Sequence, residues 1–149
     1  MSKLYDLRVA LKAQIVAAGL GWTDDTVLIK RQGSFWNQVA TAIGAAKNGN
    51  GAVLHIGIAT GKPVGDETLE MELSIPLTVI CKPQVSKDAV PEEDLWEALL
   101  LFVHDLKLSE DDHCSYRMIF DGFTDLDIEA AGGTSYLGRM TTFKRRLTL

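Results

Sequence analysis

The stretch ETLEMELSIPLTVIC, which runs from Glu67 to Cys81, alternates apolar and polar side chains along most of its length. A period of two is typical of a β-strand that buries one face and turns the other towards water or a partner. The apolar positions of this pattern are Leu69, Met71, Leu73, Ile75, Leu77 and Val79. Pro76 cannot donate a ladder hydrogen bond, so it predicts a bulge or an unpaired edge at its own position. We therefore expect one long strand with a defined inner face.

A second run of strand-forming residues, AVLHIGIAT (52–60), precedes this strand, and GIATGKP (57–63) places glycine and lysine as a phosphate-binding loop would. Such a loop needs four residues between its glycines, a hydroxyl after the lysine and a helix beyond. Here three residues separate the glycines, proline follows the lysine, and a strand comes next. Lys62–Gly65 instead fits a type I turn. We predict a long β-hairpin with Lys62 at its tip, and no nucleotide site.

Two segments outside the hairpin have the pattern of amphipathic helices. In residues 2–19, apolar side chains recur at three- and four-residue spacing, Ser2 can cap the start, and Gly19 suits the end. Residues 92–107 begin with acidic side chains and end with a lysine, which suits the helix dipole, and Pro91 suits a first turn. Between these helices we expect a strand at 26–31 and a short helix at 34–47.

The last third of the chain predicts strands at 114–123, 125–131 and 136–149. In the final strand, Phe143 and Leu147 share one face, whereas Lys144 and Arg146 project from the other. Runs of neighbouring strands with few crossovers favour an α+β fold. We therefore expect one domain, residues 1–149, with a mostly antiparallel β-sheet and two to three helices packed on one face.

The net charge of −5 is unevenly distributed along the chain. Residues 1–87 hold nine basic and seven acidic side chains, residues 88–129 hold two and thirteen, and residues 130–149 hold four basic and none acidic. Such segregation suits a protein that sets opposite charges of neighbouring copies against each other. It equally suits a solubilising acidic face beside a basic strand end. A nucleic-acid-binding protein is usually basic overall. The acidic net charge of this chain therefore disfavours that class.

Several other classes lack support in the sequence. The longest apolar run, residues 98–103, is far shorter than the ~20 residues of a membrane-spanning helix. Charged side chains interrupt the first eight residues, so we expect no signal peptide. Cys81 and Cys114 are isolated, which favours reduced thiols in the cytoplasm of the cell that makes the protein.

Few residues suggest catalysis. His55 and His104 lie among apolar neighbours in predicted elements, and residues 111–114 (Asp-Asp-His-Cys) are consecutive, so they rarely point at one ion. We therefore expect neither a metal nor a cofactor. A small α+β enzyme or ligand-binding domain with a cleft near His55 or His113 stays open as an alternative.

The order of these elements resembles the tail terminator (tail completion) proteins of tailed bacteriophages, the family of the lambda tail terminator. The resemblance rests on the N-terminal helix LYDLRVALKAQIVAAG, the long hairpin AVLHIGIATGKPVGDETLEMELSIPLTVIC, the helix EEDLWEALLLFVHDL and the closing strand YLGRMTTFKRRLTL. It implies a non-enzymatic structural protein of the virion tail or neck. Members form a ring, commonly of six copies, that caps the tail tube, stops its polymerisation and meets the head connector, while DNA passes through the channel. A head–tail connector or another neck component would also form a ring, and it stays open as an alternative.

The resemblance carries over no site residues, so candidates come from the charge pattern. Acidic side chains on the polar side of the hairpin could line the channel and let DNA slide. The hairpin candidates for channel or subunit contacts are Lys62, Asp66, Glu67, Glu70 and Glu72. The candidates for a basic subunit-interface strand are Arg139, Lys144, Arg145 and Arg146.

Overall fold

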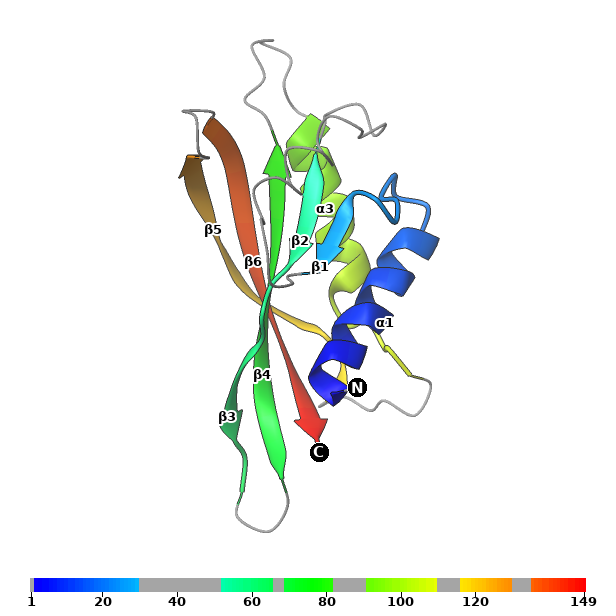
Figure 1. Cartoon of the computed structure of the whole chain (residues 1–149), viewed down its shortest axis with the longest axis vertical. Helices are drawn as coiled ribbons and strands as arrows, with labels where there is room; N and C mark the ends of the chain where they lie inside the picture. The colour runs from blue at the N-terminus through cyan, green and yellow to red at the C-terminus, as the bar shows by residue number, and fades with distance from the viewer. Residues whose placement is uncertain (1, 30–51, 66–68, 82–90, 110–115, 130–134) are drawn as a thin grey trace.

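The computed structural model describes residues 2–29, 52–65, 69–81, 91–109, 116–129 and 135–149. Six strands form one sheet in the order β1-β2-β4-β6-β5, and β3 pairs with β4 (Figure 1). The strands are β1 (Val27–Ile29), β2 (Val53–Ile56), β3 (Thr60–Pro63), β4 (Glu70–Cys81), β5 (Ile119–Glu129) and β6 (Ser135–Thr148), and the helices are α1 (Lys3–Ala17) and α3 (Pro91–Val103). The pair β1–β2 is parallel, and the other described pairs are antiparallel. The predicted α+β class is confirmed.

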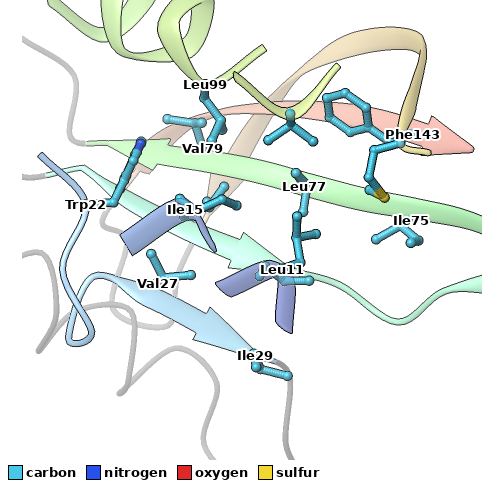
Figure 2. Close-up of a cluster of buried hydrophobic side chains, with 14 of the residues drawn as sticks. Leu11, Ile15, Trp22, Val27, Ile29, Ile75, Leu77, Val79, Leu99 and Phe143 are labelled. Atoms are coloured by element: carbon cyan, nitrogen blue, oxygen red, sulfur yellow. The ribbon is translucent and has the colours of Figure 1, made fainter. Parts of the chain in front are cut away.

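The core lies between the sheet and the two described helices. Leu11 and Ile15 of α1 and Leu99 of α3 point at side chains of β4 such as Leu77 and Val79 (Figure 2). The odd-numbered residues of β4 from Leu73 onwards are buried in this cluster, as the alternating pattern predicts. Both helices therefore pack on one face of the sheet, which we call the helix face.

Helix α1 begins and ends where its sequence predicts. The Ser2 hydroxyl accepts a hydrogen bond from the backbone N–H of Tyr5 (3.1 Å), and Gly19 just past the helix takes φ +73°. Helix α3 ends at Val103, earlier than the predicted Lys107. The cause is Asp105, which takes φ 66° and donates its backbone N–H to the carbonyl of Met118 (2.6 Å).

The long hairpin is present, but its first strand is interrupted. Residues 52–60 form β2 and then a gap, and β3 starts at Thr60. Ile56 lies opposite Leu77 and Thr60 lies opposite Ser74, so four steps along the β2–β3 segment match three steps along β4. The segment between β2 and β3 therefore carries one extra residue, as in a β-bulge. Pro76 lies opposite the gap and its carbonyl accepts from the N–H of Gly57 (2.8 Å). The bulge predicted at Pro76 thus lies on the neighbouring strand.

The predicted turn at Lys62–Gly65 is wrong. Lys62 and Pro63 are still paired with β4, opposite Glu72 and Met71, and the N–H of Val64 donates to the carbonyl of Glu70 (2.9 Å). The strand pairing continues because the even-numbered residues of β3 turn their N–H groups to β4, whereas Pro63 faces outwards and its missing N–H is not needed there. Lys62 therefore lies along the side of the hairpin, not at its tip.

The two strands predicted at 114–123 and 125–131 are one strand, β5, with a bulge. Phe120 lies opposite Phe143 and Phe123 opposite Thr141, so three residues on β5 span two on β6. Gly122 takes φ +107°, a conformation in which glycine has no steric cost. An Asp-Gly pair that suggests a turn therefore shifts the register within a continuous strand.

Several predicted features lie outside the described residues. They are the helix at 34–47, the side chains of Asp66 and Glu67, and the 111–114 group with His113 and Cys114.

Candidate assembly surfaces

Charged side chains cluster on the sheet face that points away from the helices, at the end of the sheet that contains β3. They come from four strands because register places alternate residues of each strand on the same face. We define the charged face as Lys62, Glu70, Glu72, Asp121, Lys144 and Arg146. It holds equal numbers of acidic and basic groups.

Ion pairs across strands organise the charged face. The Lys144 ammonium lies 3.5 Å from Glu72 and 3.6 Å from Asp121, and the Arg146 guanidinium lies 3.6 Å from Glu70. The Tyr116 hydroxyl also donates to Glu70 (3.1 Å). All these side chains are partly exposed, and pairs of this kind contribute about 0.2–1 kcal/mol each.

The structure therefore brings together residues that the sequence assigned to different surfaces. Glu70 and Glu72, proposed for a channel, neutralise Lys144 and Arg146, proposed for a subunit interface, within one chain. Register explains this, because Glu72 lies directly opposite Arg146 and Glu70 opposite Thr148. Lys62 lies opposite Glu72 on the other side, is exposed, and has no ion pair among the described residues.

The other two basic candidates face the helices. Arg145 is only 6% exposed, donates its Nε–H to the carbonyl of Arg146 (3.0 Å) and lies over the Tyr116 ring at 5.9 Å. Arg139 also projects on the helix face, because Arg139 and Arg145 are both odd-numbered residues of β6 and alternate residues of a strand share a face. The four basic residues of β6 thus do not form one exposed edge.

Arg139 is the centre of a cluster that joins β5, β6 and α3. Its guanidinium donates to Asp125 at 2.7 and 3.4 Å and lies 3.9 Å from Glu93. It also lies 4.7 Å from the Trp96 ring and 5.1 Å from the Phe123 ring. The hydrogen bond from Arg139 holds the pKa of the Asp125 carboxyl below its ordinary value. The cluster fixes the bulged strand β5 against the N-terminal half of α3.

A cavity of about 320 Å³ opens beside this cluster. Its lining includes Trp96, Asp127, Leu137 and the paired groups of Asp125 and Arg139. His55 does not line this cavity, and His113 lies outside the described residues. In the described part of the chain, no group of three or more His, Cys, Asp or Glu side chains is arranged to hold a metal ion.

Sequence reasoning missed this cluster apart from Arg139 itself. A simple alternation along β5 puts Phe123 and Phe120 on opposite faces, whereas the bulge at Asp121–Gly122 places both on the helix face. Phe123 is consequently close to Trp96, with ring centroids 4.9 Å apart. The Asp121-Gly122 dipeptide is the sequence signal that is compatible with a bulge here, but the same dipeptide is also typical of a turn.

The sheet is open along its two long sides as far as the described residues show. β5 has one partner, β6, and most of its described side chains are exposed, with Phe123 at 51%. On the opposite side β3 pairs only with β4, and all four of its residues are exposed. β3 and the adjoining end of β4 extend beyond both described helices (Figure 1).

No protein-family model matches this chain, and a search of curated proteins found no significant match. Among the described helices, none is both long and apolar enough to cross a membrane.

Proposed function

We propose that this chain is a tail terminator of the lambda type, a structural protein without catalytic activity. It forms a ring, commonly of six copies, at the end of the tail tube, where it stops polymerisation and joins the tail to the head connector. Its location is the tail or neck of the virion, after synthesis in the host cytoplasm. It needs no cofactor, and DNA is cargo that passes through the ring.

The observation that carries the proposal is the projecting hairpin arm, which we define as β3 and residues 69–72. All of β3 is exposed, and Leu69 at the distal end of the arm is 71% exposed. The arm extends past the helix-covered core (Figure 1). An exposed edge strand on a projecting hairpin presents unpaired backbone groups that suit contact with another protein chain.

The order of elements gives further support. The N-terminal helix, the long hairpin, the second described helix and a closing antiparallel pair follow one another as the family resemblance implies. The two open sides of the sheet suit a subunit that has neighbours on both sides, as each member of a ring does.

The charged face changes the expected chemistry of the channel. Glu70 and Glu72 are balanced by Arg146 and Lys144, so the face alternates in sign and is neutral in sum. A neutral, alternating surface binds the DNA backbone weakly, since net neutralisation of phosphates requires excess positive charge. DNA could slide past such a surface without the acidic lining that the sequence suggested.

Co-sedimentation with tubes of the tail tube protein from the same phage tests the proposal. A terminator binds tube ends only, so the bound amount should rise when the same mass of tube protein is sheared into shorter tubes. Binding in proportion to tube mass, whatever the number of ends, would contradict the proposal, and so would no binding at all.

A further inference from the structure

The outer side of β5 presents backbone groups ready for another strand. The N–H of Leu149 donates to the carbonyl of Leu69, so odd-numbered residues of β6 turn to β4 and even-numbered ones to β5. Thr124 and Leu126, opposite Met140 and Gly138, therefore bond to β6. The N–H and C=O groups of Phe123, Asp125 and Asp127 consequently point out of the sheet.

The backbone groups of β3 alternate in the same way between β4 and the outer side of the sheet. The N–H of Val64 donates to the carbonyl of Glu70, so the even-numbered residues Lys62 and Val64 turn to β4. Gly61 and Pro63 point outwards. Pro63 offers only a carbonyl there, which is where proline is tolerated in a sheet.

Strand directions allow these two sides to meet in a ring. β4 and β5 are both antiparallel to β6, so they run in the same direction, and β3 runs opposite to both. Lys62 lies level with Arg146 of β6, whereas Thr124 lies level with Met140, so the two sides can meet only with a stagger. Copies related by rotation about an axis inclined to the strands, as in a β-barrel, would bring β3 of one copy antiparallel to β5 of the next. The helix faces of both copies would lie on the same side, because Gly61 and Asp125 both project on that face.

Pairing of β5 with β5 of a second copy is disfavoured by charge. Asp125 and Asp127 point their backbone groups outwards, so such a pair would set carboxylates against carboxylates across the contact. The described residues of β3 include no acidic side chain, and Lys62 is its only charge.

We propose that β3 of a second copy of this chain adds to the outer side of β5, with Lys62 opposite Thr124. This inference rests on the proposed ring. Gly61 and Asp125 then exchange two backbone hydrogen bonds, and the carbonyl of Pro63 accepts from the N–H of Phe123. The Pro63 ring covers the exposed Phe123 ring on the helix face. Lys62 lies on the other face, diagonal to Asp121, whose carboxylate it shares with Lys144.

Cysteine cross-linking tests this pairing. Lys62 and Thr124 would form a non-hydrogen-bonded cross-strand pair, whose Cα atoms lie about 4.5 Å apart and suit a disulfide. The variant K62C/T124C, made on a chain with Cys114→Ser, should form an intermolecular ladder after mild oxidation, ending in a closed ring. Its yield should exceed that of the K62C and T124C single variants by about tenfold. The matched control K62C/L126C moves one thiol two residues along the same face and should form little product.

Each alternative result overturns the inference. A T124C chain that gives dimers as readily as the double variant would indicate pairing of β5 with β5. A ladder from K62C/L126C in place of K62C/T124C would contradict the stated register. If circular dichroism shows that the variants are folded and no ladder forms, the proposed contact between β3 and β5 does not exist. The proposed function is judged separately by tube binding of the wild-type chain, so either proposal can fail alone.

Discussion

At the residue scale, the contact between Asp125 and Arg139 explains how a bulged edge strand is held in place. The Arg139 guanidinium on β6 is placed between two aromatic rings and two carboxylates that come from α3 and β5. A planar guanidinium can stack on aromatic rings and at the same time direct N–H groups towards two carboxylates, which a lysine ammonium cannot do. Arg139 therefore serves the fold of one chain, although its position on β6 first suggested an interface role.

The Asp125 pair should make stability depend on pH at the acidic end. Because Arg139 lowers the pKa of Asp125 below 3.8 in the folded chain, the stabilisation is fully present above the unfolded pKa and is lost as pH falls through the folded pKa. Asp125→Asn should therefore lower the free energy of unfolding at pH 7, and the difference from wild type should shrink below pH ~3.8. Urea unfolding across this pH range measures it.

The control is Asp127→Asn, which removes a neighbouring exposed carboxylate without an ion pair among the described residues. We expect it to leave the acidic limb of the stability curve almost unchanged. A D125N curve parallel to that of wild type at all pH values would show that the pair does not stabilise the fold.

Residue types alone could not separate the roles of the charged candidates. The acidic and basic sets lie far apart in sequence, and only the register of β4 against β6 shows that Glu72 meets Lys144. Arg145 lies between two partly exposed cations in sequence yet is buried. Strand alternation predicts that Arg145 and its two neighbours lie on opposite faces. It does not predict that the Tyr116 ring packs against Arg145.

At the element scale, the sequence predicts best where one strong periodic pattern determines the outcome. Helix α1 and strand β4 follow their apolar patterns, and the Ser2 cap and Gly19 end occur as expected. The strand predictions are wrong where one strand has an extra residue relative to its partner, at Gly57–Ala59 and at Asp121–Gly122. A bulge depends on the partner strand, so a pattern within one segment does not reveal it.

The break between β2 and β3 should be sensitive to a single methyl group. A Cβ on Gly57 would lie 2.7 Å from Cγ of the Pro76 ring and 3.3 Å from the Pro76 carbonyl oxygen. Gly57→Ala should lower the free energy of unfolding by about 1–3 kcal/mol, as overpacking usually does. Thermal and urea unfolding measure the change.

The matched test is the double variant G57A/P76A, which removes the contacting Cγ atom and supplies an N–H towards residue 57. It should recover much of the loss, so the two substitutions should be non-additive. A G57A chain as stable as wild type would contradict this account of the break.

At the scale of the whole molecule, fold class follows from element order, whereas function does not. Adjacent strands after a single crossover helix already favour an antiparallel sheet with helices on one face. An assembly protein has no catalytic motif to find in one chain, since its working surfaces are completed by other subunits. The uneven charge along the sequence suggested such surfaces, but folding pairs many of those charges internally.

The length of tail tubes is the most direct measure of the central claim, that this chain terminates tube polymerisation. Tail tube protein of the same phage would be polymerised with increasing amounts of the chain, and tube lengths measured by negative-stain electron microscopy. We predict shorter tubes with a ring-shaped density at one end, and a mean length that falls as the ratio of this chain to tube protein rises. Unchanged lengths and bare ends at every ratio would contradict the claim.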